Sequence, residues 1–187
     1  MCPVLESQVP ESPVPESQVP ESQVPESQVP ESQKVEQVWD TPSLDEIPVL
    51  SRAHVEAMET TDHEAVWVQA GMDHILLRTI GRRSAKVHKV ALPVWKDPDG
   101  RRIVVASFAG APGHPAWYLN MLDRSANPEV LCRARDRQYW STPEFPVGQD
   151  YERLWELVNN DRAWYRTYQA RTERTIPLVR LPETRPA

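Results

Sequence analysis

The sequence of 187 residues has two cysteines, which excludes a disulfide framework and a cysteine-rich zinc site. Cys132, in the stretch EVLCRA, is predicted to be a small buried hydrophobe rather than a reactive thiol. No apolar run approaches the roughly 20 residues that a helix needs to cross a bilayer. The N-terminus also lacks the basic and apolar segments of a secretory signal. These absences favour a reducing, cytoplasmic setting, with contact at the inner face of the membrane as the alternative.

Lysine and arginine are absent from residues 1–33, which hold six of the 27 acidic residues and seven of the 19 prolines. The 21 remaining acidic residues match the 21 basic ones, so the net charge of −6 belongs to this part of the chain. Between Glu6 and Gln33 a PESQV unit repeats, with too little apolar surface to offset the entropy lost on ordering. We therefore expect a disordered tail over residues 1–38, either a spacer or a docking segment for an unknown partner, and one domain over residues 39–187.

Motifs for several common chemistries are missing as well. The sequence has no GxSxG nucleophile elbow, no GxxxxGK[ST] phosphate loop and no GxGxxG dinucleotide fingerprint. Its five histidines include no pair at a metal-ligand spacing such as HxxxH, so we expect no metal site. A domain without net charge, preceded by an acidic tail, also argues against nucleic acid as a partner.

Hydrophobic periodicity and turn residues predict a mostly β domain with helices between its strands. The turn KDPDG predicts a hairpin of residues 87–95 and 101–108, with Pro93 placing the first strand at an edge or a bulge. SLDE at 43–46 has the form of a capping box, and Ser51 is the expected cap of the first helix. Because no βαβ alternation is present, a compact antiparallel barrel is favoured. Further strands are expected at 74–80, 129–134, 137–147 and 176–181, and helices at 51–59, 116–125, 150–160 and 163–172.

The densest cluster of charge is RTIGRRSAKVHK, residues 78–89, which contains no acid. Gly81 permits a tight turn, and the Ser84 hydroxyl and exposed amides can donate to anionic oxygens. The planar fork of arginine suits phosphate and carboxylate. The cluster is either a binding site for a polyanionic small molecule or a solvated basic turn, and the residues themselves leave both interpretations open.

Two aromatic features could contact a ligand. In ASFAGAPGHPAWYLN, residues 106–120, a loop of small residues leads into a helix that carries Trp117 and Tyr118, so the backbone can approach a flat molecule closely. Tyr165 and Tyr168 are three residues apart and so share one helix face. Ordinary core packing is the competing interpretation of both features.

Four stretches in this order, ILLRTIGRRSAK, RIVVASFAGAPGHPAWYLNML, NPEV and YRTYQARTERTIPLV, resemble the deazaflavin-dependent nitroreductase and quinone-reductase family of actinobacteria. The resemblance covers residues 72–182. It implies a mainly β fold with helices (α+β), a split β-barrel of the flavin- and deazaflavin-binding type, preceded by the disordered repeat tail. It also implies the coenzyme F420, an 8-hydroxy-5-deazaflavin that is flat at one end and polyanionic at the other.

The resemblance further assigns cofactor-binding and catalytic residues by their place in these motifs. The residues implied to hold the anionic groups of F420 are Arg82, Arg83 and Ser84, continued by His88 and Lys89. The residues implied to run along or line the coenzyme are Ser107, Phe108, Ala109, Gly110, Trp117, Tyr118 and Asn120. Tyr165, and less directly Tyr168, are implied to stand near the substrate as catalytic residues.

Several positions depart from the family pattern. The departures are Ala85 for glycine, His88 for arginine, Val90 and Ala91 for a polar residue and proline, Phe108 for a polar residue, Ala109 for glycine and Arg162 for a substrate-facing tyrosine. Because the basic cluster and the aromatic helix are retained, the resemblance still implies the coenzyme, but it does not carry the identity of the substrate.

The activity implied is hydride transfer from reduced F420 to an electron-poor organic acceptor, such as a quinone, an enone or a nitro compound. Two alternatives stay open at this point. One is a non-catalytic split-barrel protein that carries a lipid, haem or a cofactor. The other is an oxidoreductase that uses flavin mononucleotide (FMN) in a related split barrel. In each case the partner of the domain is a small molecule.

Overall fold

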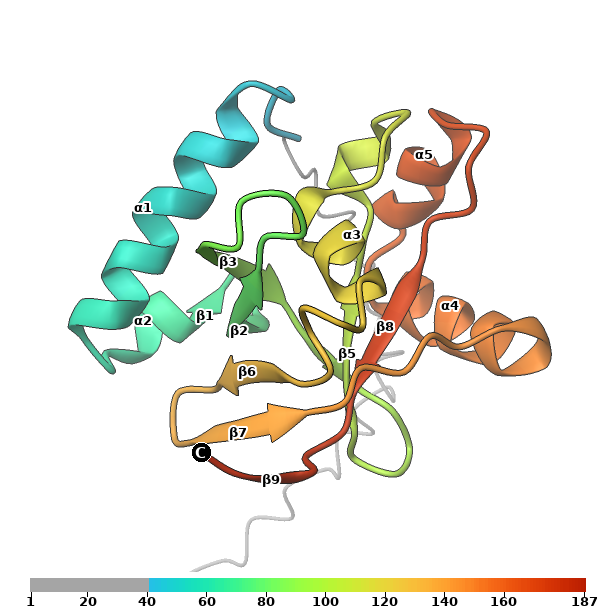
Figure 1. Cartoon of the computed structure of the whole chain (residues 1–187). Coiled ribbons are helices and arrows are strands. Elements are labelled where there is room, and N and C mark those ends of the chain that lie inside the picture. Colours follow the sequence, from blue (N-terminus) through green and yellow to red (C-terminus); the bar gives the residue numbers. More distant parts are fainter. Residues whose placement is uncertain (1–40) are drawn as a thin grey trace, which may run out of the picture. The chain divides into compact units, whose positions relative to one another are not determined.

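The computed structural model describes residues 41–187. The repeat tail, its expected disorder and the expected domain boundary at residue 38 lie outside the described residues. The described chain is mixed α+β (Figure 1). Its helices are α1 (Glu46–Thr60), α2 (Glu64–Trp67), the short 3-10 turn η1 (Phe108–Gly110), α3 (Ala116–Leu122), α4 (Gly148–Asp161) and α5 (Trp164–Ala170). Its strands are β1 (Val68–Gln69), β2 (Met72–Ile80), β3 (Val87–Pro93), β4 (Trp95–Lys96), β5 (Arg102–Val105), β6 (Val130–Arg133), β7 (Gln138–Ser141), β8 (Leu178–Leu181) and β9 (Arg185–Pro186).

The strands form two antiparallel sheets. The larger has the order β1-β2-β6-β7-β9, with β3 added beside β2, and the smaller has the order β4-β5-β8. A single bridge between Glu144 and Arg180 links the segment after β7 to β8. The pairing found among residues 41–187 does not run around a closed barrel, so the closed form expected from the sequence is replaced by two sheets.

Both sheets contribute to one hydrophobic core. Ile75 and Leu77 of β2 and Cys132 of β6 pack in the same cluster as Val104 of β5 and Val179 of β8, and all five have no exposed surface (0%). Burial raises the pKa of the Cys132 thiol to about 12. The prediction that Cys132 is a buried, unreactive side chain is therefore confirmed.

The hairpin predicted across KDPDG forms only in part. The turn is present, because the Gly100 N–H donates to the Asp97 carbonyl and β4 pairs with β5 on either side of it. Residues Val87–Pro93 do not join this hairpin; as β3 they pair with β2 instead. Val94, which follows Pro93, belongs to neither strand, so the long strand expected at 87–95 is divided between two sheets. The prediction that residues 87–95 form one strand paired with residues 101–108 was therefore wrong.

The first helix starts earlier than predicted. α1 begins at Glu46, not after Ser51. Ser43 and Glu46 form the capping box: Glu46 Oε2 accepts from the Ser43 N–H at 2.8 Å, and the Glu46 N–H donates to Ser43 Oγ at 3.4 Å. Pro48 lies in the first turn, where its missing N–H would have no partner within the helix. The proline therefore does not interrupt α1.

A buried ion cluster joins β8 to its surroundings. Arg180 Nε lies 2.9 Å from Asp97 Oδ2, and the other guanidinium nitrogens reach Asp150 and Glu144. Burial raises the pKa of Asp97, but hydrogen bonds from Arg101 and the charge of Arg180 outweigh it and hold the pKa below its ordinary value. Removal of one partner from this cluster would leave an uncompensated buried charge.

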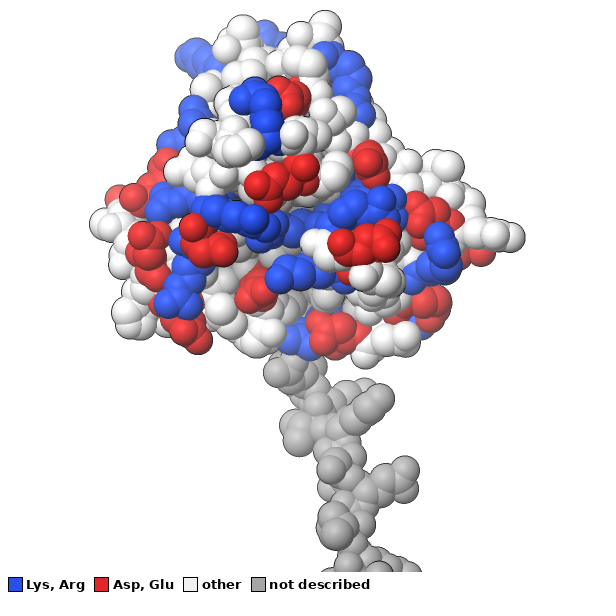
Figure 2. All heavy atoms as spheres, turned by 90° about the horizontal axis from the view of Figure 1, so that it is seen from below, with Lys and Arg blue, Asp and Glu red and all other residues white. Residues whose placement is uncertain are grey.

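The face seen in Figure 2 carries both signs of charge side by side. The β6–β7 hairpin and β9, at the bottom of Figure 1, contribute the arginines of several ion pairs. These are Arg133 with Asp62, Arg135 with Glu64, Arg137 with Glu183 and Arg185 with Glu129. In the part of the chain described, no helix combines the length and the apolar character that crossing a bilayer requires.

Candidate functional site

A cavity of about 680 Å³ lies between the sheets, α1, α3 and α5. This volume is in the range of small-molecule and cofactor sites. Of the residues assigned to the site from the sequence, the following line it: Arg82, Arg83, Ser84, His88, Lys89, Ser107, Phe108, Ala109, Trp117, Asn120, Tyr165 and Tyr168. Gly110 and Tyr118 are not part of the lining. The basic turn and the indole of the aromatic helix thus border one space.

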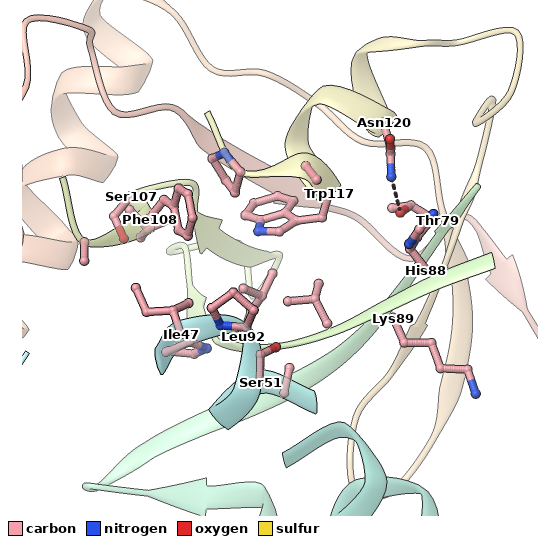
Figure 3. A pocket seen from close by; sticks show the side chains of 18 of the residues that line it. Ile47, Ser51, Thr79, His88, Lys89, Leu92, Ser107, Phe108, Trp117 and Asn120 are labelled. Carbon is pink, nitrogen blue, oxygen red and sulfur yellow. Dashed lines mark hydrogen bonds between the residues drawn. The ribbon is translucent and has the colours of Figure 1, made fainter. Parts of the chain in front are cut away.

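Two walls of the cavity face each other in Figure 3. Ser107, Phe108 and Trp117 form one wall, while Ile47 and Ser51 of α1 and Leu92 of β3 form the other. Both walls are largely apolar. The pair Thr79 and Asn120, with His88 beside it, lies toward one end of the cavity, so polar groups gather at that end. The shape favours a flat molecule with one polar terminus.

The basic turn between β2 and β3 is closed by backbone hydrogen bonds. The Gly81 N–H donates to the Lys86 carbonyl, and the Ala85 N–H donates to the Gly81 carbonyl, both at 2.8 Å. A Cβ at Gly81 would lie 2.4 Å from Ser84 Oγ and 2.6 Å from His88 Nε2, so any side chain there would displace the ends of these two side chains. Ala85, which stands where the family pattern has glycine, takes a left-handed φ of 52°. The departure from the pattern therefore places a strained alanine in the turn.

Two buried asparagines hold the turn against α3. Asn120 Oδ1 accepts from the Arg82 N–H at 3.2 Å and from its Nη1 at 3.3 Å, while Asn120 Nδ2 donates to Thr79 Oγ1. Asn127, from the NPEV stretch, exchanges hydrogen bonds with the backbone of Ile80 and donates to the Asn120 carbonyl. Sequence reasoning assigned no role to Asn127, although the position belongs to a stretch that resembles the family.

The cations of the turn differ in how they are engaged. The side chains of Arg83 and Lys86 are exposed and make no hydrogen bond or ion pair with any residue of the 41–187 range. Lys89, in contrast, forms an ion pair with Glu59 of α1 and points away from the cavity in Figure 3. His88 Nε2 lies 3.1 Å from Ser84 Oγ. Arg83 and Lys86 are therefore the cations most available to an anion, whereas the charge of Lys89 is already matched.

The loop after β5 adopts an unusual backbone. Phe108, Ala109 and Gly110 have φ values of 47°, 51° and 81°, so three successive residues are left-handed. Two of them carry side chains that disfavour this region. Gly110 faces α5, because a Cβ there would lie 2.5 Å from the Tyr168 carbonyl oxygen. Gly110, assigned to the coenzyme from the sequence, thus serves the contact between this loop and α5.

Arg174 holds this left-handed loop in place. Its Nη2 donates to the Ser107 carbonyl at 2.7 Å, its Nε to the Ala111 carbonyl at 2.9 Å and its Nη1 to the Ala106 carbonyl at 3.3 Å. Nη1 also lies 3.2 Å from His114 Nδ1. Burial, together with the Arg174 charge, lowers the pKa of His114. Arg174 therefore does not line the cavity itself but positions the loop that does.

The two aromatic residues of α3 have different surroundings. Trp117 is 8% exposed and presents its indole to the cavity (Figure 3). Tyr118 packs instead against His114 and Phe145, with ring centroids 5.0 and 5.8 Å away. Burial raises the pKa of Tyr118. Tyr118 thus makes the packing contacts that the competing interpretation expects, and its contact with the coenzyme stays a prediction.

Tyr165 and Tyr168 lie together on α5 with their ring centroids 5.5 Å apart, and they are 5% and 6% exposed. Burial is the main cause that raises the pKa of Tyr165, so its phenol stays protonated near neutral pH. Tyr168 Oη lies 3.1 Å from Thr41 Oγ1. The hydroxyl of Tyr168 is thus engaged by the N-terminal segment.

Arg162 does not line the cavity. Its guanidinium donates to the carbonyls of Ala70 and Gly71 in the β1–β2 turn and lies 5.5 Å from the centroid of the Trp164 ring. Trp164 itself lines the cavity. Where the family pattern has a substrate-facing tyrosine, this chain therefore has Arg162, which contacts the lining residue Trp164 and the β1–β2 turn.

Sequence reasoning missed the wall formed by α1 and β3. The missed lining residues include Pro42, Ile47, Pro48, Ser51, Val90, Ala91, Leu92 and Pro93, together with Met72 and His74 of β2. The capping box at 43–46 was a signal for the early start of α1, but nothing in the sequence indicates that this turn reaches the cavity. Among the described residues no cluster of histidine, cysteine, aspartate or glutamate could hold a metal ion.

The chain matches known proteins over most of its described length. The sequence model of the family described as F420H2-dependent quinone reductase matches residues 50–183. Proteins named F420H2-dependent quinone reductase from Mycobacterium tuberculosis strains H37Rv and CDC 1551 are each 37% identical over 108 residues, which cover 56% of this chain and 70% of theirs. The match gives no support to the FMN alternative.

Two solved structures are similar in fold. The structure described as an F420H2-dependent reductase (FDR-A) has 32% sequence identity and a TM-score of 0.50, covering 58% of this chain and 93% of that one. A second, described as a domain-swapped dimer, has 30% identity and a TM-score of 0.53, covering 70% of this chain and 96% of that one. The resemblance seen in the motifs is confirmed: the chain belongs to the F420H2-dependent quinone reductase family, a family of oxidoreductases whose coenzyme is F420.

Proposed function

We propose that the chain binds reduced F420 in the cavity and transfers a hydride from it to a quinone-type acceptor. Arg82, Arg83 and Ser84 of the basic turn would hold the polar end of the coenzyme. Ser107, Phe108 and Ala109, beside Trp117, would hold its flat ring system, and Tyr165 would stand near the acceptor.

One observation carries this proposal: a single cavity of about 680 Å³ is bordered both by the basic turn and by the indole of Trp117. An elongated molecule with a flat end and an anionic end needs both borders at once. The exposed side chain of Arg83, which has no partner among residues 41–187, supplies a fork for phosphate or carboxylate oxygens. The largely apolar walls suit a ring system. The residues present therefore fit the coenzyme that the family requires.

The coenzyme supplies the hydride when it is bound. The protein holds donor and acceptor in contact, which removes most of the entropic cost of bringing them together. The walls around Phe108 and Trp117 exclude water from the reacting rings. Tyr165, kept protonated by burial, donates a hydrogen bond to the acceptor oxygen as negative charge develops on it. Tyr168 stands beside Tyr165 and packs against its ring.

Titration of the purified protein with F420 tests the coenzyme site. Arg83→Ala should weaken F420 affinity about tenfold or more, because a charge-assisted contact is lost. Arg78→Ala is the matched control, since Arg78 is a neighbouring exposed arginine that does not line the cavity. Unchanged affinity in both Arg83→Ala and Ser84→Ala would show that the turn does not hold the coenzyme.

Turnover against a panel of quinones tests the reaction. Reduced F420 should be oxidised by wild-type protein, and Tyr165→Phe should slow that oxidation while F420 affinity persists. An unaltered rate would remove the role given to Tyr165. A protein that binds F420 but oxidises it with no quinone, enone or nitro compound would be the non-catalytic carrier of the alternative interpretation.

The finer description of the fold belongs to this proposal. Because the two sheets share one core and are bridged at Glu144 and Arg180, we treat them as the two halves of a split barrel. The cytoplasmic setting and contact with the inner face of the membrane stay predictions from the sequence, as do the role of the repeat tail and the nitro-reducing activity.

A further inference from the structure

We infer that the segment from Thr41 to Ser51 forms one wall of the acceptor subsite and that Ile47 in it determines which acceptors fit. The inference rests on the proposed function, because it concerns the substrate of the same cavity. It adds a specificity-determining residue from a part of the chain that precedes the family match, which begins at residue 50.

The segment reaches the cavity with several residues. Pro42, Ile47, Pro48 and Ser51 are all part of the lining. Ile47 and Ser51 are four residues apart and so lie on one face of α1, and both are half-buried. Val49, between them, is 62% exposed and points to solvent. One face of the first turns of α1 is therefore directed at the cavity and the other is not.

Two attachments fix this wall at its ends. At the near end, Thr41 Oγ1 lies 3.1 Å from Tyr168 Oη on α5. At the far end, Val55 and Met58 of α1 pack with Trp67 and Leu76 in a separate buried cluster. The first turns of α1 thus extend across the cavity between one polar contact and one apolar anchor.

The position of the wall decides which ligand it contacts. Ile47 lies with Leu92 on the side of the cavity opposite Phe108 and Trp117 (Figure 3). The proposed coenzyme ring lies along Phe108 and Trp117, so the space between that ring and Ile47 is left for the acceptor. Because this wall carries no charged side chain and is mostly apolar, with Ile47, Pro48 and Leu92 beside Ser51, it favours a planar, uncharged ring over an anionic or strongly hydrated acceptor.

Steady-state kinetics of full-length variants test the inference. Ile47→Ala should raise KM for a bicyclic quinone about fivefold, from the apolar contact removed, and should leave the dissociation constant of F420 within twofold of wild type. Val49→Ala is the matched control on the same helix and should change neither quantity. An unchanged KM in Ile47→Ala, with F420 still bound, would overturn the inference.

A bulkier variant guards against loss of folding in Ile47→Ala. Ile47→Phe narrows the space instead of opening it, so it should raise KM more for a bicyclic quinone than for a monocyclic one. Equal effects on the two quinones would contradict a steric role. If wild-type protein fails to bind F420 at all, the proposed function fails; if F420 binds and oxidation proceeds but neither Ile47 variant changes acceptor preference, only the inference fails.

The contact between Thr41 and Tyr168 gives an independent readout. Thr41→Val and Tyr168→Phe each remove the same hydrogen bond, so the double variant should raise the acceptor KM no further than either single variant does. Additive effects of the two substitutions would show that the contact does not hold the wall.

Discussion

Asn120 Oδ1 accepts two hydrogen bonds from Arg82, one from its backbone N–H at 3.2 Å and one from its guanidinium at 3.3 Å. The other end of the same amide donates to Thr79 Oγ1 at 3.1 Å. One buried side chain of α3 therefore fixes both the backbone of the basic turn and the direction of its first arginine. Asn120 is therefore a positioning residue for the basic turn, and its contact with the coenzyme stays a prediction.

Substitutions of Asn120 should separate its contribution to stability from its effect on coenzyme binding. Asn120→Ala leaves the Arg82 N–H without its partner and should lower the free energy of unfolding by about 1–3 kcal/mol. Asn120→Asp still accepts from Arg82 and can accept from the Thr79 hydroxyl, so it should be less destabilising, yet its charge should weaken binding of the polyanionic coenzyme. Urea unfolding and F420 titration measure the two quantities. Equal F420 affinity in wild type and Asn120→Asp would contradict the proximity of this residue to the anionic groups.

Arg174 offers a second test of positioning. Arg174→Lys keeps the charge, but a single ammonium group cannot bond the carbonyls of Ala106, Ser107 and Ala111 together. We expect a loss of about 1–3 kcal/mol in unfolding free energy and a higher KM for F420, because the left-handed loop is released. Arg166→Lys, on exposed Arg166 of α5, is the control and should behave as wild type. Wild-type kinetics and stability in Arg174→Lys would show that Arg174 does not hold the loop in place.

Most of the residues assigned to the site from the sequence line the cavity, but the sequence indicates less of the geometry around them. The strands around Ile75 and Leu77 and the helix of Trp117 follow from local pattern, because apolar periodicity and turn residues are written in consecutive residues. The pairing of β3 with β2 rather than β5 does not follow from local pattern. The residues around Val94 have the composition of one continuous strand, and only tertiary packing divides the segment at Val94. The place of Ile47 in the cavity lining depends on the packing of α1 against β3, two segments far apart in the sequence, and no local pattern encodes it.

Strain in the left-handed loop predicts an unusual response to glycine. Ala109 has φ 51°, so Ala109→Gly should relieve a cost of about 1–2 kcal/mol and lose part of it to the greater freedom of the unfolded chain. The expected net change is a gain of about 0.5 kcal/mol in unfolding free energy. Ala53→Gly, the same substitution at an exposed position of α1, should instead cost about 0.5–1 kcal/mol. Denaturant unfolding of both variants decides whether the signs are opposite.

His74 predicts acid sensitivity. Burial, helped by repulsion from nearby His54 and only partly offset by the Met72 carbonyl and Asp73, lowers the pKa of His74 from 6.5 to about 4. The unfolded chain therefore takes up a proton between these pH values that the folded chain does not, so stability is lost as pH falls through this window, by at most about 3 kcal/mol. His74→Gln should flatten the pH dependence of unfolding free energy. A wild-type slope in His74→Gln would contradict this origin.

Gly110 gives the loop no room for a side chain, because a Cβ there would lie 2.5 Å from the backbone of Tyr168. Any larger residue would have to displace α5. That displacement would move Tyr165 and Tyr168, and Tyr168 is the hydrogen-bond partner of Thr41. Adaptation of such an enzyme to a new electron acceptor is therefore constrained at a position outside the cavity lining. Laboratory evolution should vary Ile47 freely while leaving this glycine untouched.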